Sequence, residues 1–211
     1  MNFDGLIFDL DGTLWDCTKV STDACNLIFE RLGVERRVSV DFMRSICGRP
    51  TSECDEMLMS GLSDSIREQA VRSLEEVENS LVREYAPRAL YEGVREGLGA
   101  LGERYALYVV SNCGEKYLSV FCEFSTIGGL FKDSESYGRT KRVKAENIRS
   151  LVERQALKSP CYIGDTAGDE DAAEKAGVPF FHARYGFGVP KGSPVAFGSF
   201  GELSRYFLEL A

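Results

Sequence analysis

Two aspartates, Asp9 and Asp11, stand two positions apart at the end of a short apolar run that contains Leu6, Ile7 and Phe8. Side chains at positions i and i+2 of a strand point to the same side, so these carboxylates repel each other unless a cation lies between them or one holds a proton. Such a pair can bind Mg²⁺, and an aspartate can attack a phosphoryl group as a covalent nucleophile. The alternative interpretation is a turn rich in Asp and Gly that ends an ordinary strand.

Further polar groups follow later apolar runs in the same way. Ser111 and Asn112 follow one run, and Asp165 follows another, with Asp169 four residues further on. Taken singly, these residues could also be helix caps and favourable charges in a first helical turn. Because ligands of parallel sheets bind at the carboxyl ends of the strands, we expect Asp9, Ser111 and Asp165 to share one site.

A basic stretch, Arg139 to Lys144, precedes a predicted helix. Lys144 stands where that helix starts and is the preferred lysine for a phosphate site at this sheet edge. Lys141 is the alternative, because the ends of elements are the least certain part of a sequence-based prediction. For the other residues of the stretch, a solvated helix approach is the simpler explanation.

The periodicity of apolar residues places these groups on an α/β scaffold. Residues 15–87 have a nearly all-helical pattern, with helices predicted at about 20–32, 39–46, 51–60 and 64–85, the last ending before Pro87. From residue 88 the pattern alternates, with helices at 94–101, 117–124, 143–155, 169–176 and 201–209, strands at 106–110, 131–136, 160–163 and 178–181, and a loop at 184–199. Alternation of this kind predicts a doubly wound, Rossmann-like parallel sheet covered by helices on both faces. The predicted domains are an α/β core of residues 1–14 and 88–211, and a helical cap of residues 15–87 inserted after the first strand.

Composition limits the partners and the compartment. The chain has 211 residues, is 44% hydrophobic and carries a formal net charge of −8, which disfavours binding to nucleic acid or to an anionic membrane surface. The seven cysteines are odd in number and show no Cys-x-x-Cys spacing, a pattern typical of reduced intracellular thiols. There is no signal-peptide pattern and no apolar run long enough to span a bilayer, so we expect a cytoplasmic protein. Nothing suggests an obligate partner, and we expect a monomer or a weak homodimer.

Together, Asp9-x-Asp11, Ser111-Asn112, the lysine and Gly164-Asp165…Asp169 resemble the motifs of the haloacid dehalogenase superfamily of phosphohydrolases, in the branch with a helical cap after the first motif. The resemblance covers essentially the whole chain. It implies that Asp9 is the nucleophile, and that Asp11 is the general acid and then the general base.

The resemblance also implies a phosphate site and a metal site. Ser111 and the backbone N–H of Asn112 would bind the phosphoryl oxygens, and Lys144 would neutralise their charge. Mg²⁺ would be held by the Asp9 carboxylate, the Asp11 backbone carbonyl and Asp165, with Asp169 as a further ligand or as support through water.

Departures from relatives within the superfamily narrow the reaction. The dehalogenases have another residue in place of Asp11. Phosphonate-cleaving members use a cap lysine, whereas the predicted cap of this chain has only Lys19, close to the first motif. The related phosphomutases use cap histidines and lysines, and the predicted cap of this chain has no histidine. Hydrolysis of a small phosphorylated metabolite remains, with a phosphomutase or a catalytically idle binding module as alternatives. Arg49, in a Gly-Arg-Pro setting that resembles a specificity loop of phosphoglycolate-phosphatase-like members, could bind the substrate or could be an ordinary surface arginine.

Overall fold

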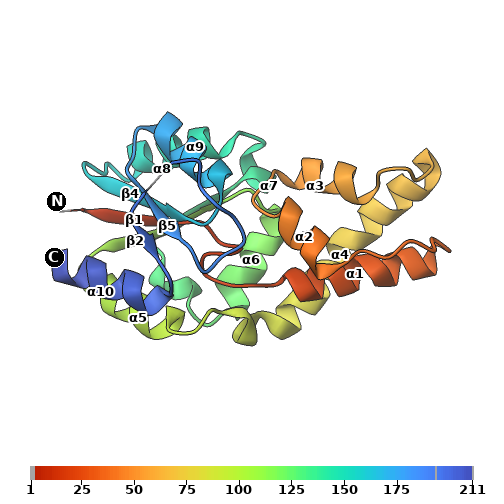
Figure 1. The fold of residues 1–211 in the computed structure, drawn as a ribbon, viewed down its shortest axis with the longest axis horizontal. Helices are drawn as coiled ribbons and strands as arrows, with labels where there is room; N and C mark the ends of the chain where they lie inside the picture. Colours follow the sequence, from red (N-terminus) through yellow and green to blue (C-terminus); the bar gives the residue numbers. More distant parts are fainter. Residues whose placement is uncertain (1–2, 193, 211) are drawn as a thin grey trace.

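A computed structural model describes residues 3–192 and 194–210. Its centre is a six-stranded, all-parallel sheet in the order β3-β2-β1-β4-β5-β6 (Figure 1). The strands are β1 (Gly5–Phe8), β2 (Ala106–Ser111), β3 (Asp133–Ser136), β4 (Pro160–Gly164), β5 (Phe180–Ala183) and β6 (Ala196–Phe197). The α/β fold class predicted from the sequence is confirmed.

Strand β1 occupies the middle of the sheet because its residues are apolar on both faces. It pairs with β2 on one side and β4 on the other, so that Phe8 lies opposite both Val109 and Ile163. The strand order changes direction between β1 and β4, which is where doubly wound sheets bind their ligands. Asp9 is the first residue after β1 and therefore lies at this switch point.

Helices cover both faces of the sheet, as the alternation of side chains along β1 requires. Leu6 and Phe8 belong to one apolar cluster with α5 (Val94–Gly102), α6 (Glu115–Phe124) and α10 (Phe200–Leu210). Ile7 belongs to another cluster with α8 (Lys144–Arg154) and α9 (Ala167–Ala176). Two short elements, a 3₁₀ turn at Gly128–Leu130 and α7 (Tyr137–Thr140), flank β3. The core is thus a three-layer sandwich.

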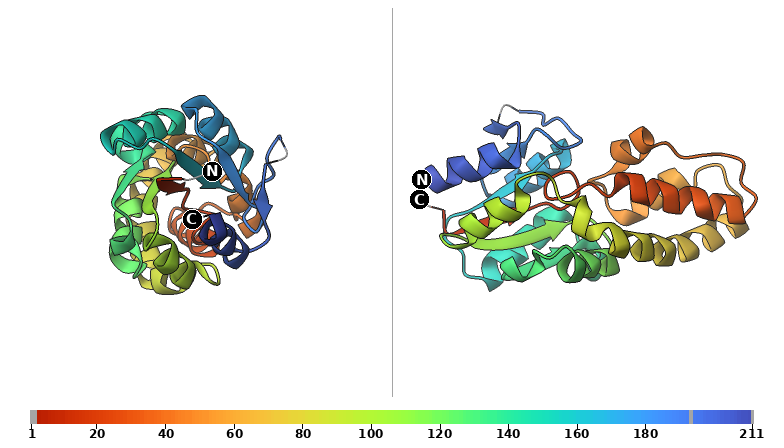
Figure 2. Two further views of the ribbon diagram at one scale, coloured as in Figure 1. Left: turned by 90° about the vertical axis from the view of Figure 1, so that its left-hand side faces the viewer. Right: turned by 90° about the horizontal axis from the view of Figure 1, so that it is seen from below.

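Four helices extend from the carboxyl edge of the sheet, and we refer to them as the helical cap (Figures 1 and 2). They are α1 (Thr18–Arg31), α2 (Val40–Ile46), α3 (Thr51–Leu58) and α4 (Asp64–Ala89). The cap has an apolar cluster of its own, which includes Phe29, Met43 and Leu74. The last turns of α4 instead pack into the core, where Val82 and Ala86 join the cluster around β1. We propose the cap as a separate structural unit, with α4 as its rigid connection to the core.

Most element ends differ from the prediction by about two residues, and three differences have a physical reason in the structure. Helix α4 continues through Pro87 to Ala89, because a proline in the last turn removes only one backbone hydrogen bond near the helix end. The predicted loop at 184–199 contains β6, a two-residue strand held by pairing of Ala196 with His182. Strand β3 begins at Asp133 rather than at residue 131. None of these differences moves a candidate site residue to another element.

Among residues 3–192 and 194–210, no helix combines the length and the apolar character needed to cross a membrane.

Candidate active site

The loop after β1 brings the first two aspartates to the sheet edge. The backbone N–H of Asp9 donates to the carbonyl of Ile163 in β4 at 2.8 Å, which extends the ladder by one residue, and the Asp9 side chain is buried. The chain then turns sharply at Gly12, whose φ is +84°. A Cβ at Gly12 would lie 2.3 Å from Oδ2 of Asp165, so only glycine allows this loop to approach β4. The Asp-Gly sequence thus has a structural as well as a chemical reason.

Lys144 connects the motifs electrostatically. Its ammonium donates to Oδ1 of Asp9 at 2.9 Å and to Oδ1 of Asp169 at 2.5 Å, and its side chain is only 4% exposed. Burial by itself would lower the pKa of Lys144, but the carboxylates of Asp169 and Asp9 raise it well above its ordinary value. Lys144 is therefore a permanent buried cation between β1 and α9. Lys141, the alternative, is exposed, and its ammonium lies over the ring of Tyr137.

Asp169 is positioned by the start of α9. Its Oδ2 accepts from the backbone N–H of Asp165 and from both the N–H and the hydroxyl of Thr166, while the Thr166 hydroxyl accepts from the N–H of Asp169. This capping box fixes the carboxylate at the helix N-terminus. With Lys144 on its other oxygen, Asp169 has both carboxylate oxygens engaged.

Asp165 lies between the β1 loop and a later loop. Its Oδ1 accepts from the hydroxyl of Thr13 at 3.4 Å and its Oδ2 from the backbone N–H of Phe187 at 2.7 Å. A Cβ at Gly186 would lie 2.4 Å from the Asp165 Cβ, so this second loop also needs a glycine. Burial, with the nearby negative charges of Asp169 and Asp9, raises the pKa of Asp165 well above its ordinary value.

The three carboxylates of Asp9, Asp165 and Asp169 can hold a metal ion. Each offers an oxygen within 4.8 Å of the other two, and all three are buried. One ammonium, that of Lys144, cannot neutralise three carboxylates, so the group has a residual negative charge. A hard divalent cation with oxygen ligands, such as Mg²⁺, fits this donor set.

Asp11 has an environment different from that of Asp9. Its Oδ1 accepts from the hydroxyl of Tyr117 at 2.7 Å and from the indole N–H of Trp15 at 2.9 Å. Burial raises the pKa of Asp11 to about 7, although the Tyr117 hydrogen bond opposes the shift. Burial likewise raises the pKa of Asp9 to about 6, and Lys144 limits that shift. Lys144 thus favours the ionised form of Asp9, whereas Asp11 lies beside a neutral phenol and a neutral indole.

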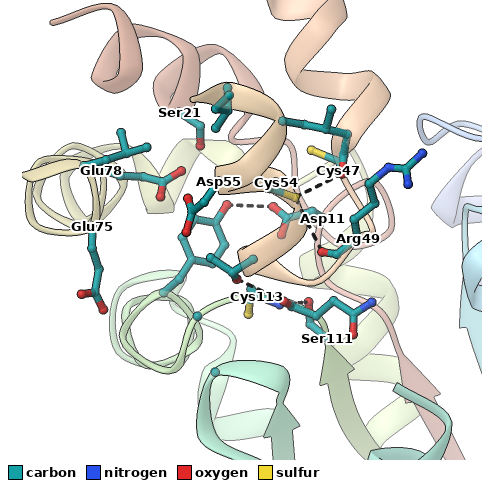
Figure 3. A pocket seen from close by; sticks show the side chains of 18 of the residues that line it. Asp11, Ser21, Cys47, Arg49, Cys54, Asp55, Glu75, Glu78, Ser111 and Cys113 are labelled. Carbon is teal, nitrogen blue, oxygen red and sulfur yellow. Dashed lines mark hydrogen bonds between the residues drawn. The ribbon is translucent and has the colours of Figure 1, made fainter. Parts of the chain in front are cut away.

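A cavity of about 460 Å³ lies between the cap and the sheet edge (Figure 3). Asp9, Asp11 and Ser111 line it from the core, and Asn112 and Arg49 also line it. The Asn112 side-chain amide donates to the carbonyl of Gly48 at 2.8 Å, which joins the core to the cap. Lys144, Asp165 and Asp169 are not among the lining residues. Lys144 contacts Asp9, and Asp165 and Asp169 each offer an oxygen within 4.8 Å of an Asp9 oxygen.

Arg49 is the predicted site residue with the most exposed side chain. Its side chain is half exposed, and its guanidinium is 3.8 Å from the carboxylate of Glu53, one helical turn away. It reaches the cavity mouth without contacting the aspartates. Arg49 is thus both a surface arginine and a lining residue of the cavity.

The partners that hold the carboxylates were not predicted from the sequence. Tyr117, on α6, lies 106 positions from Asp11, and Thr13 lies 152 positions from Asp165. A tyrosine on the apolar face of a predicted helix carries no signal of such a contact. Gly12 was the one available signal, because a glycine directly after two aspartates indicates a close approach of backbone to another group.

Comparison with known proteins agrees with this geometry. A family model described as haloacid dehalogenase-like hydrolase matches residues 6–183, so the chain belongs to that family. The resemblance inferred from the motifs is confirmed. The chain is 27% identical over 194 residues to a 5′-nucleotidase from Pseudomonas aeruginosa, a match that covers 89% of this chain and 86% of that protein. It is 25% identical over 190 residues to a phosphoglycolate phosphatase from Nitrosospira multiformis, covering 86% of this chain and 83% of that protein.

Solved structures share the fold over the whole length. A predicted phosphoglycolate phosphatase from Haemophilus somnus superposes with a TM-score of 0.86 at 21% identity, covering 98% of each chain. A haloacid dehalogenase-like hydrolase from Streptococcus pneumoniae superposes with a TM-score of 0.83 at 22% identity, covering 98% of this chain and 99% of that one. This chain therefore shares its fold with these structures over nearly its whole length.

Proposed function

We propose that this protein is a Mg²⁺-dependent phosphatase that hydrolyses small phosphomonoesters through an aspartyl-phosphate on Asp9. The observation that carries the proposal is that two aspartates with different partners line one cavity. Asp9 lies beside the Lys144 ammonium, and Asp11, two residues away, accepts from Tyr117 and Trp15, with a pKa that burial raises to about 7. One carboxylate that attacks and one that can give up a proton are the two groups that this reaction needs.

The first step transfers the phosphoryl group to the enzyme. An Asp9 oxygen attacks phosphorus, the bond from phosphorus to the leaving oxygen breaks, and the proton of Asp11 passes to that oxygen to release an alcohol. In the second step the ionised Asp11 takes a proton from water, whose oxygen attacks the phosphorus of the aspartyl-phosphate. Inorganic phosphate leaves, and Asp9 and protonated Asp11 are regenerated.

The surrounding residues neutralise and orient the transferring group. Ser111 and the backbone N–H of Asn112 would donate to phosphoryl oxygens from the end of β2, and Lys144 would keep Asp9 ionised. Asp9, Asp165 and the Asp11 backbone carbonyl would hold Mg²⁺, with Asp169 as support, since its oxygens are engaged by Lys144 and Thr166. The bound ion supplies positive charge against the phosphoryl oxygens.

The leaving group is the open part of the proposal. Phosphoglycolate-like substrates follow from the Arg49 motif and from the names of the relatives, and nucleotides follow from the name of the P. aeruginosa relative. The cavity has room for a small metabolite of either class above the aspartates, and the cap would exclude bulk water during turnover.

The test is phosphate release from a panel of small phosphomonoesters, measured with Mg²⁺ and with a chelator. Wild-type turnover should need the metal, and Asp9→Asn, which removes the nucleophile and keeps the shape, should abolish it. Arg67→Gln, a change of an exposed cap residue outside the cavity, is the control and should keep full turnover. A folded wild-type protein that releases no phosphate would refute the phosphatase. Release that needs a sugar bisphosphate activator would instead indicate a phosphomutase, and metal binding without any turnover an idle binding module.

A further inference from the structure

The cap side of the cavity carries acidic side chains. Asp55 of α3 and Glu75 and Glu78 of α4 line it, and Figure 3 shows these three on the opposite side of the cavity from Ser111. The phosphatase chemistry does not use them. A leaving group that occupies the cavity while its phosphate lies at Asp9 must come close to these carboxylates.

Positive charge on the protein neutralises only part of this acidic group. Glu75 is paired with Lys116, 3.5 Å away, and both side chains are more than half exposed. Across residues 3–192 and 194–210, neither Asp55 nor Glu78 has a cationic side chain within ion-pair distance. The other two cations of the cavity lining are turned to other partners, Arg49 to Glu53 and Lys141 to the ring of Tyr137.

The pKa values of Asp55 and Glu78 are raised, as expected for carboxyl groups without a cation beside them. Burial, together with the negative charge of Glu75, raises the pKa of Asp55 to about 6. Burial also raises the pKa of Glu78, against the hydrogen bond from Ser21 and with the help of Asp55 and Glu75. Both shifts are those of acids that a bound cation would stabilise in the ionised form.

The neutral side chain of Asn79, one residue beyond Glu78 on α4, also lines the cavity. Its amide donates to the carbonyl of Glu75 at 2.6 Å, while its Oδ1 is closed to solvent and, within the described part of the chain, accepts no hydrogen bond. Asn79 therefore adds no positive charge beside the carboxylates.

Five apolar side chains also line the cap part of the cavity, together with the smaller polar Thr18, Ser21 and Thr51; the apolar ones are Met43, Ile46, Leu58, Val71 and Leu74. They can pack against the carbon skeleton of a leaving group. Asp55 and Glu78 are partly buried, which strengthens their attraction for a cation.

We propose that the physiological substrate is a phosphomonoester whose leaving group carries an amine on an alkyl skeleton, with the ammonium bound by Asp55 and Glu78. The inference rests on the proposed function and names the substrate class for the same site. A substrate with a carboxylate in the leaving group, such as phosphoglycolate, would place a negative charge toward these acids and is disfavoured.

The test compares phosphate esters that differ only in the charge at the far end. ω-Aminoalkyl, ω-hydroxyalkyl and ω-carboxyalkyl phosphates of increasing chain length are assayed for kcat/KM above pH 7 with Mg²⁺. A charge-assisted hydrogen bond implies a preference of about tenfold or more for the amine over the hydroxyl compound at the best length. Glu78→Gln and Asp55→Asn should each reduce that preference, whereas Glu76→Gln, an exposed position of α4 outside the cavity, should keep it.

Equal rates for the amine and hydroxyl series, or a preference for the carboxylate, would overturn the inference while leaving the phosphatase intact. An amine preference that survives both substitutions would overturn the assignment to Asp55 and Glu78. If no compound is hydrolysed, the proposed function fails, and calorimetry of the same compounds with Asp9→Asn still decides the inference. Tighter binding of the amine series supports it, and equal or weaker binding refutes it.

Discussion

Replacement of Lys144 by methionine tests the electrostatic centre of the site. The substitution removes a buried ammonium that lies 2.9 Å from Asp9 and 2.5 Å from Asp169, and it keeps a side chain of similar length. Removing one partner of a buried ion pair costs about 3–5 kcal/mol, because the remaining charge is left without compensation. For a chain of this size that corresponds to a fall in Tm of roughly 6–20 °C.

The loss should depend on pH in a defined direction. In the wild type the raised pKa of Lys144 keeps its ammonium protonated from pH 5 to 8, since the proton is lost only as pH rises through a value above 10.5. In the variant the pKa of Asp9 rises beyond its wild-type value of about 6, because the lowering effect of Lys144 is gone. A carboxyl group with a raised folded-state pKa destabilises the fold above that pKa, and the penalty shrinks as pH falls through it. The difference between variant and wild type should therefore be about 1–2 kcal/mol smaller at pH 5 than at pH 8.

The assay is urea unfolding of both proteins at the two pH values, in the presence of a chelator so that no metal masks the charge. Lys141→Met, at an exposed position, is the matched control and should change the free energy of unfolding by less than about 0.5 kcal/mol. A Lys144→Met loss below about 1 kcal/mol, or one that is equal at both pH values, would refute the reasoning.

Two further predictions concern the loop after β1. Tyr117→Phe removes a hydrogen bond that lowers the pKa of Asp11, so this pKa should rise above about 7. The alkaline limb of the kcat–pH profile follows loss of the proton from the general acid and should therefore move to higher pH. An unchanged limb, or a shift to lower pH, would show that Asp11 is not the general acid. Gly12→Ala forces a side chain into a φ of +84° and against Asp165, which should cost about 2 kcal/mol or more in urea unfolding and weaken Mg²⁺ binding measured by calorimetry. Gly99→Ala, in α5 with nothing within 4 Å of the new Cβ, is its control and should be neutral or stabilising by up to about 1 kcal/mol; a Gly12→Ala protein as stable as this control would contradict the steric argument.

The sequence was sufficient to predict the parts of the fold that depend on local patterns. Apolar runs of strand length, separated by helical periods, predict a parallel sheet, and the carboxyl ends of those strands must then lie at one edge. That rule alone brings Asp9, Ser111 and Asp165 to one edge from distant positions in the chain. Strand β6 was not predicted because two residues are too few to show an alternating pattern. The strand forms through its pairing with the neighbouring edge of β5.

The contacts that set the protonation of the site could not be predicted in the same way. Whether Tyr117 reaches Asp11 depends on the rotation of α6 against the β1 loop, which no pattern within α6 encodes. The acidic side of the cavity is equally hidden, because Asp55, Glu75 and Glu78 appear in the sequence as ordinary charges on helix faces. Only the tertiary arrangement of α3 and α4 over the sheet edge brings these charges to the same cavity as the aspartates of the core.

The central claim is that Asp9 carries the phosphoryl group between the two steps. The most direct measurement is rapid acid quenching during turnover with Mg²⁺, followed by mass spectrometry of the peptide that contains Asp9. The account predicts the mass of one added phosphoryl group on Asp9, absent from the Asp9→Asn protein. Steady turnover with no modified peptide, or with the phosphoryl group on another residue, would contradict it.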